Sequence, residues 1–163
     1  LTTRALDVWV AERGVDGVVV LEFAPEIEHD GVLLGGRLDR FTEIPAGAFH
    51  GVLDARAPRS EGDDESEALE LAASNAERAL SILRAAPERP RAVFVNDATI
   101  PFQHERGDPD RLAAYCEGAE VAVLNAFESD ELGVDHPVTR YEREALAALG
   151  ARADRRAELG DSS

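Results

Sequence analysis

The chain has 163 residues and a formal net charge of −16, from 33 acidic and 17 basic residues. All 17 basic residues are arginines, because the sequence contains no lysine. A surface of this sign repels nucleic acid and anionic membranes, which bind proteins through Lys and Arg contacts to phosphate. We therefore expect neither a nucleic acid nor a membrane as partner, and no apolar run is long enough to cross a bilayer.

Hydrophobic residues make up 44% of the sequence, which is enough for one domain with its own core. The single cysteine, Cys116, cannot form an internal disulfide, which fits a cytoplasmic location. On a predicted helix, we expect it to be a small buried hydrophobe. Many acids without lysine resemble the cytoplasmic proteins of salt-loving archaea. The alternative is an ordinarily acidic protein from a GC-rich genome.

Apolar residues at helical spacing predict a helix over Leu1–Arg13, with Leu1, Ala5, Val8 and Trp9 on its apolar face. The sequence then alternates between short apolar runs, typical of buried strands, and longer amphipathic segments, typical of helices. The later predicted elements are strands at Val18–Leu21, Gly47–Arg56, Arg91–Ile100 and Glu120–Phe127, and helices at Asp63–Arg84, Asp108–Gly118 and Thr139–Gly150.

Two finer expectations concern the helices. Thr139 and Glu142 have the spacing of a capping box, which predicts that the last helix begins at Thr139. In the long helix, Arg78 belongs to the polar face that we expect to contact solvent.

Strands that alternate with helices predict an α/β fold with a mostly parallel sheet and helices on both faces, in three Rossmann-like layers. Val18–Leu21, Val93–Val95 and Val121–Leu124 are predicted to be neighbouring parallel strands in the core. We interpret residues 1–152 as a single α/β domain and residues 153–163 as a flexible acidic C-terminal tail.

Polar side chains follow each predicted strand, at the edge where ligands bind in such sheets. They are Glu22 after the first strand, Asp54, Arg56 and Arg59 after the second, Asn96 and Asp97 after the third, and Asn125 and Glu128 after the fourth. Because parallel strands end at the same edge, we expect these groups to converge. Mutual repulsion should then raise the pKa of at least one carboxylate unless an arginine or a cation offsets it.

One strand end resembles a known motif. AVFVND, residues 92–97, resembles the Walker B segment of P-loop nucleotidases, whose aspartate holds magnesium through its water shell. Residues 1–23 resemble the helix and strand that follow the phosphate loop in that fold, as if the chain began just past the loop. Asn125 is similar to the strand-end asparagine that contacts the base in MinD-like members. The chain thus resembles the P-loop NTPase superfamily, MinD-like (SIMIBI) or kinase-like, without its N-terminal Walker A strand and loop.

The resemblance implies an ATP- or GTP-binding phosphohydrolase or phosphotransferase, such as an ATPase, a GTPase or a small-molecule kinase, with Mg²⁺ as cofactor. It implies these roles: Asp97 positions the metal; Asn125 and Asn96 contact the nucleotide; Glu22 and Asp54 face the γ-phosphate or a second substrate; Arg56 or Arg59 neutralises charge. The sequence contains no GxxxxGK[ST] motif. We therefore expect the 163-residue chain itself to bind nucleotide poorly and to be inactive.

A glycine pair precedes two arginines in GVLLGGRLDRF, residues 31–41. Arg37 and Arg40 could clamp a phosphate or carboxylate beside Gly35–Gly36. Equally, the pair could form a hairpin turn whose arginines bind surface acids such as Asp39.

A second hypothesis is a non-catalytic α/β binding or interaction module of a halophile. Its exposed sheet edge would pair with another chain, including a second copy in a homodimer. In this interpretation Asp97 only caps the turn after its strand. The sequence upstream of Leu1 distinguishes the two hypotheses, because only the first requires a phosphate loop there.

The charge predicts how stability depends on salt. Because salt screens the repulsion between like charges, we expect the midpoint of thermal unfolding to rise as KCl increases toward molar concentration. Melting curves at low and at molar KCl measure this, and an equal or lower midpoint at molar KCl would contradict the halophile interpretation.

Overall fold

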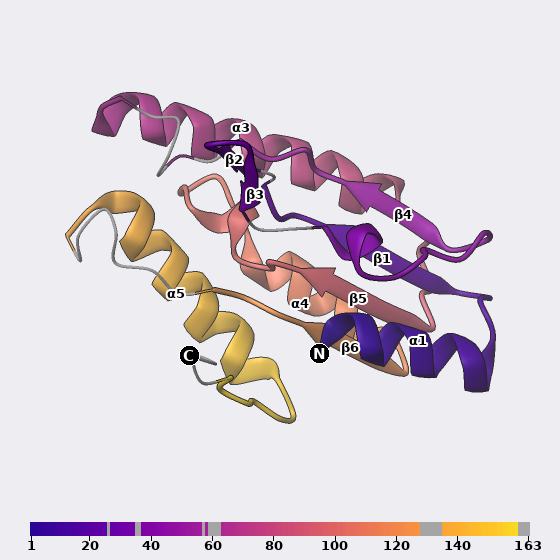
Figure 1. The fold of residues 1–163 in the computed structure, drawn as a ribbon. Coiled ribbons are helices and arrows are strands. Elements are labelled where there is room, and N and C mark those ends of the chain that lie inside the picture. The colour runs from indigo at the N-terminus through magenta and orange to yellow at the C-terminus, as the bar shows by residue number, and fades with distance from the viewer. Residues whose placement is uncertain (26, 35–36, 57, 59–62, 128–134, 160–163) are drawn as a thin grey trace.

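The structure is a computed structural model that describes the chain except residues 26, 35–36, 57, 59–62, 128–134 and 160–163 (Figure 1). The elements are α1 (Thr2–Arg13), β1 (Val18–Glu22), β2 (Ile27–His29), β3 (Val32–Leu34), the 3₁₀ helix η1 (Leu38–Arg40), β4 (Phe49–Val52), α3 (Glu65–Ala85), β5 (Ala92–Asn96), the 3₁₀ helix η2 (Ile100–Phe102), α4 (Pro109–Glu117), β6 (Val121–Leu124) and α5 (Pro137–Arg152).

The main sheet has four strands in the order β4-β1-β5-β6, and all neighbouring pairs are parallel. All five residues of β1 and all five of β5 are buried, as continuous apolar runs predict. The predicted α/β fold with a parallel sheet is therefore confirmed. So is the prediction that the apolar runs in β1, β5 and β6 are neighbours.

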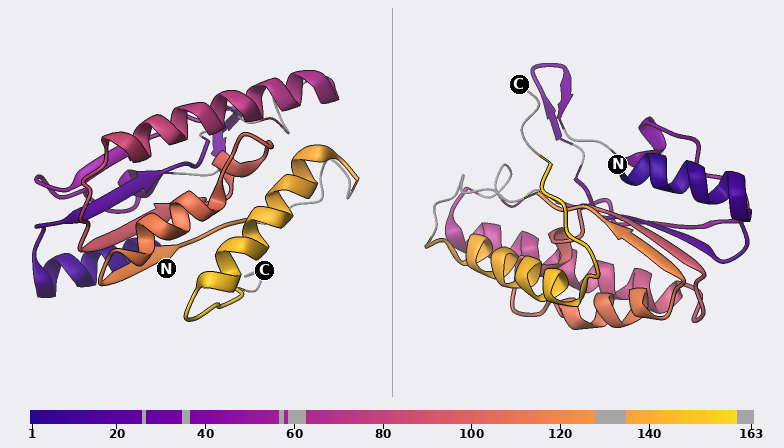
Figure 2. Two further views of the ribbon diagram at one scale, coloured as in Figure 1. Left: turned by 180° about the vertical axis from the view of Figure 1, so that it is seen from behind. Right: turned by 90° about the horizontal axis from the view of Figure 1, so that it is seen from below.

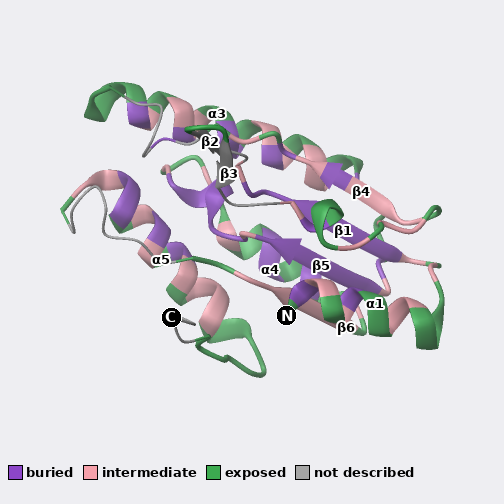
Figure 3. Ribbon diagram, in the orientation of Figure 1, coloured by how far each residue is buried: buried purple, intermediate pink, exposed green. Residues whose placement is uncertain are grey.

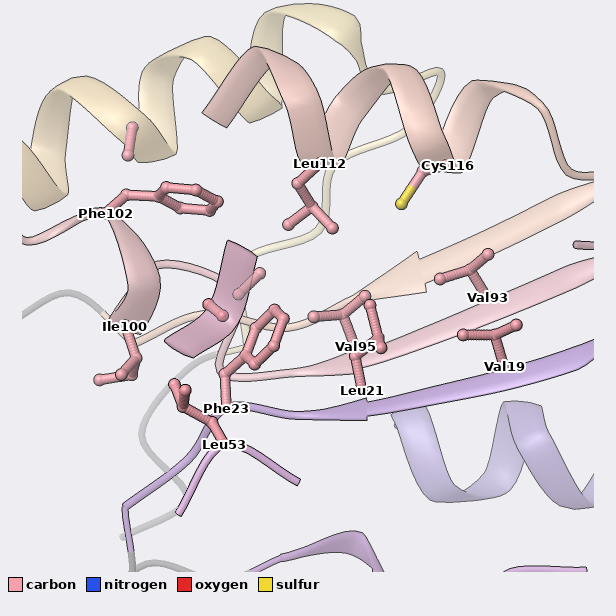
Figure 4. Packing of buried hydrophobic residues seen from close by; sticks show 13 residues of the cluster. Val19, Leu21, Phe23, Leu53, Val93, Val95, Ile100, Phe102, Leu112 and Cys116 are labelled. Atoms are coloured by element: carbon pink, nitrogen blue, oxygen red, sulfur yellow. The ribbon is translucent and has the colours of Figure 1, made fainter. Parts of the chain in front are cut away.

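Helices cover both faces of this sheet (Figure 2). Helix α1 lies on one face, and α3, α4 and α5 lie on the other. Because successive strand residues point to opposite faces, each strand supplies both cores. Val18, Val20 and Phe94 pack with Leu6 of α1. The larger cluster includes Val19, Leu21, Phe23, Val93 and Val95, with Leu112 and Cys116 of α4 above them (Figure 4).

Burial follows this layering (Figure 3). Cys116 is a buried hydrophobe, as expected, and burial raises the pKa of its thiol to about 12. The thiol is therefore protonated and unreactive at neutral pH. Among the described residues, no helix has the length and apolar character needed to cross a membrane.

The apolar face predicted for α1 is wrong in part. Leu1 and Val8 are 71% and 47% exposed, whereas Leu6 is fully buried and Thr2 nearly so. Helix α1 contacts β5 and β6, and Leu6 packs fully into this core with Ala5, Trp9 and Val10 partly buried around it. The spacing of apolar residues alone does not show which side of the helix is buried.

The predicted start of α5 at Thr139 is also wrong. The helix begins at Pro137, and the N-cap is His136, whose Nδ1 accepts a hydrogen bond from Val138 N–H at 3.1 Å. Proline at the first helical position favours this earlier start. Glu142 is 3% exposed, and its carboxylate accepts a hydrogen bond of 2.5 Å from Gln103 Nε2.

Within the residues that the structure describes, two strands and two short helices were not predicted. The antiparallel hairpin β2–β3 turns at Asp30 and Gly31, which have φ of 51° and 74°. Strand β5 ends at Asn96, four residues before the predicted end, because Asp97 adopts a φ of 58° and the chain enters η2.

A second stability prediction concerns the hydrophobic core. Leu21 is fully buried between β4 and β5, so Leu21→Ala should lower the free energy of unfolding by about 2–5 kcal/mol. Leu159 is 71% exposed, and Leu159→Ala should change the free energy of unfolding by less than about 0.5 kcal/mol. Urea unfolding of both variants measures the difference. Equal values would contradict the assignment of β1 as the central core strand.

Candidate functional site

The carboxyl ends of the four parallel strands form one edge, and those predicted polar residues that the structure describes lie along it. Glu22 ends β1 directly opposite Asn96, which ends β5. Backbone hydrogen bonds continue past these ends: Leu53 N–H donates to Glu22 O at 2.9 Å, and Phe23 N–H donates to Asn96 O at 3.1 Å. The structure thus places the tips of β4, β1 and β5 side by side.

Glu22 is the most deeply buried acidic group of this edge. Its side chain is fully buried, and both carboxylate oxygens accept from Leu38 N–H at 3.0 Å. Asn96 Nδ2 donates a longer hydrogen bond of 3.5 Å to Glu22 Oε2. Glu22 therefore joins β1 to η1, which lies on the same side of the sheet as α1.

The pKa of Glu22 is raised from 4.5 to about 7, mainly because burial disfavours the charged carboxylate. The hydrogen bonds from Leu38 and Asn96 lower the pKa. The charge of Asp39 raises it slightly, and the charge of Arg37 lowers it slightly. One raised carboxyl pKa at this edge was expected, but from repulsion between strand-end acids. Desolvation is the cause instead.

Asp97, Asn125 and Thr2 form a second connection across the edge. Asn125 Oδ1 accepts from Asp97 N–H at 2.9 Å, and Asn125 Nδ2 donates to Thr2 Oγ1 at 2.8 Å. Asn125 therefore holds the left-handed backbone of Asp97 and the first turn of α1 together. The residue that the resemblance assigns to the base is also a structural link.

This link brings a helix N-terminus to the edge. Helix α1 has no side-chain cap at Leu1 and no acidic residue in its first turn. The first N–H groups of a helix and its dipole favour an anion at that end. The half-buried Asp97 thus lies close to a region of positive potential, linked to it through one asparagine side chain.

Asp54 lies farther along the edge, after β4. Its side chain is exposed and its φ is 51°. Arg78 of α3 holds this turn, because its Nη1 donates to Leu53 O at 3.1 Å and to Asp54 O at 3.0 Å. Asn75 binds the backbone of Arg56 in both directions, at 2.9 and 2.8 Å. Arg78 is therefore half-buried and not on the solvent face as predicted.

The other predicted arginines have separate places. Arg37 pairs with Asp39 at 2.6 Å, which lowers the pKa of the Asp39 carboxyl, and Arg40 is exposed at the end of η1. This pair matches the alternative in which the arginines bind surface acids. Arg56 has an exposed side chain. Gly35–Gly36, Arg59 and Glu128 lie outside the described residues.

Sequence reasoning missed three parts of this edge. Leu38 acts through its backbone N–H, which no side-chain pattern indicates. Thr2 was read only as part of an amphipathic helix. Asn75 is fully buried in the middle of α3, and a polar residue on the apolar face of a helix was the available signal.

The donor set at this edge is compatible with magnesium, although no group of three or more His, Cys, Asp or Glu within the described ranges is arranged to hold a metal. Magnesium in phosphoryl-transfer sites uses one or two carboxylates together with phosphate oxygens and water. Asp97 follows β5 at this edge, and Asn125 links its backbone to the first turn of α1.

Comparison with known proteins adds nothing to this description. No protein-family model matches the chain, and neither a curated protein nor a solved structure matches it. The function must therefore be inferred from the arrangement of the edge.

The raised pKa of Glu22 predicts a pH dependence of stability. Between pH 4.5 and about 7 the folded state retains a proton that the unfolded chain has lost, so the free energy of unfolding falls as pH rises. This contribution is complete below pH 4.5, is lost by about pH 7, and amounts to about 3 kcal/mol. Glu22→Gln retains an acceptor for Leu38 N–H and should remove this fall.

The measurement is urea unfolding of both proteins from pH 4.5 to 7.5. The variant should gain stability relative to the wild-type chain across this range. Glu158→Gln, at an exposed position, is the matched control and should run parallel to the wild type. A Glu22→Gln curve that also runs parallel would contradict the raised pKa.

Proposed function

We propose that this chain is the nucleotide-binding part of a P-loop-type phosphohydrolase or phosphotransferase that uses ATP or GTP. One observation carries the proposal: the side chain of Asn125 ties the first turn of α1 to the backbone of Asp97, at 2.8 and 2.9 Å. A helix N-terminus attracts phosphate, and a strand-end aspartate positions Mg²⁺ on the same phosphates. Both requirements meet at this edge.

In this proposal, Asp97 orients the metal through its carboxylate. Its left-handed backbone, at φ 58°, turns the chain sharply at the end of β5. Bound Mg²⁺ would neutralise charge on the phosphoryl oxygens. Asn125 contributes the second N–H of its amide to the base, because the first already binds Thr2.

Glu22 has a different role from Asp97, since its carboxyl is buried and has a pKa of about 7. A group that ionises near neutral pH can accept or release a proton at the working pH. In the proposed enzyme, Glu22 exchanges a proton at the carboxyl edge, and the hydrogen bond from Asn96 orients its carboxyl group. Asp54 and Arg56 are exposed on the neighbouring strand end, where a second substrate would approach.

The proposal requires a phosphate loop directly before α1. None of the 163 residues supplies a Gly-Lys-Ser/Thr step. A chain extended upstream through such a loop should therefore bind MgATP or MgGTP, whereas the 163-residue chain should not. If the natural upstream sequence contains no such loop, the interaction-module hypothesis is favoured instead.

The decisive variant is Asp97→Asn in the extended protein. Asparagine tolerates the left-handed backbone, so the fold should persist, while loss of the carboxylate charge should lower Mg²⁺-dependent nucleotide hydrolysis on the order of 100-fold or more. Asp16→Asn, at an exposed position before β1, is the matched control and should retain activity. Hydrolysis rates and circular dichroism measure both effects. Full activity in a folded Asp97→Asn protein would refute the metal role.

A further inference from the structure

A cavity of about 200 Å³ lies on the face of the sheet that α3, α4 and α5 cover. It is located between α3 and the segment that joins η2 to α4. This is not the side on which Glu22 meets η1. Phe23 follows Glu22 directly but belongs to the opposite core, because successive residues of an extended chain point to opposite faces. The cavity is therefore separate from the proposed nucleotide site.

The floor of the cavity is apolar. Phe23 is fully buried, and Ala79 and Phe102 are 2% and 5% exposed. Figure 4 shows Phe23 and Phe102 both on the side of the sheet that α4 covers. The half-buried Leu80 and Leu83 of α3 form the remaining apolar wall. An apolar cavity of about 150 Å³ accommodates benzene, so this one has room for a group of about six to eight carbons.

One wall is held in place by close backbone packing. A Cβ atom at Gly107 would lie 2.6 Å from Pro101 O and 2.9 Å from the Cα of Phe102. Only glycine allows the chain to approach this closely. The loop after η2 is therefore packed tightly against Phe102, and the cavity wall is formed without a ligand.

The charged residues at the cavity are not equivalent. Arg106 pairs with Glu77 at 2.6 Å, and Asp108 caps α4 by accepting from Asp110 N–H at 3.1 Å. Arg111 lies in the first turn of α4, lines the cavity, and forms no ion pair with any residue that the structure describes. Arg106 and Arg111 both line the cavity, and because Glu77 already neutralises Arg106, the exposed Arg111 is the one that can bind an added anion.

We propose that this cavity binds a small monocarboxylate. Its apolar group of about six to eight carbons would occupy the space over Phe23 and Phe102, and its carboxylate would pair with the guanidinium of Arg111. The cavity walls exclude water from the apolar group, and the arginine selects acids over neutral molecules of the same shape. This inference is independent of nucleotide binding.

Phenylacetate tests the proposal, with phenylacetamide as the neutral molecule of the same shape. Titration of the ¹⁵N-labelled 163-residue chain at constant ionic strength should give saturable shifts at Phe23, Leu80, Phe102 and Arg111. Phenylacetamide should bind about tenfold more weakly, because it lacks the charge-assisted hydrogen bond.

Two variants locate the site. Arg111→Gln should weaken phenylacetate binding about tenfold and leave phenylacetamide unchanged, whereas Arg89→Gln, at an exposed arginine outside the cavity, should change neither. Leu80→Trp should fill the cavity and abolish binding of both probes. The unliganded spectrum of each variant establishes that it is folded.

Several results would overturn the proposal. These are equal affinity for the two probes, unchanged phenylacetate affinity in folded Arg111→Gln, shifts that do not saturate within the solubility of phenylacetate, and shifts scattered over the surface.

Discussion

Parallel pairing of two strands that are buried on both faces, β1 and β5, is the constraint on which the rest of this structure depends. Such strands have no polar face, so each must be covered on both sides, which explains α1 on one side and α3 and α4 on the other. The register also sets the chemistry of the edge. With Val18 opposite Ala92, Glu22 necessarily lies opposite Asn96, and both chains become polar at the same level.

This arrangement desolvates the carboxyl group of Glu22. A carboxylate that ends a fully buried strand loses its hydration, and a single backbone N–H from Leu38 and a long bond from Asn96 do not replace it. The raised pKa follows from that balance. Asn75 differs, because its amide pairs in both directions with the backbone of Arg56 and carries no charge to desolvate. Asn75 is thus tolerated because it is paired, and Glu22 is tolerated with its ionisation displaced.

The two faces of the sheet provide two different chemical environments. On the α1 side, the edge brings together a helix N-terminus, the backbone of Asp97 and a linking asparagine, which is where we propose that a phosphate binds. On the α3 side, aromatic and aliphatic side chains line a cavity with two arginines, of which Arg106 is paired with Glu77 and Arg111 suits the carboxylate of an apolar acid. Glu22 and Phe23 are consecutive residues. Glu22 belongs to the environment on the α1 side, and Phe23 to the one on the α3 side.

The sequence by itself determined the order of the four sheet strands and of the helices between them, the parallel sheet and the residues that follow each strand, because these depend on local periodicity and on the fact that parallel strands end together. It determined that Glu22, Asn96 and Asp97 lie along one edge. Only the tertiary structure decided which side chains are buried there and what they bind. The hydrogen bonds of Glu22 to Leu38, of Asn125 to Thr2 and of Asn75 to Arg56 join segments between 16 and 123 residues apart. No local pattern encodes such contacts, because they depend on how α1, η1 and α3 pack on the sheet, and packing decides which groups are desolvated and which side of α1 is buried.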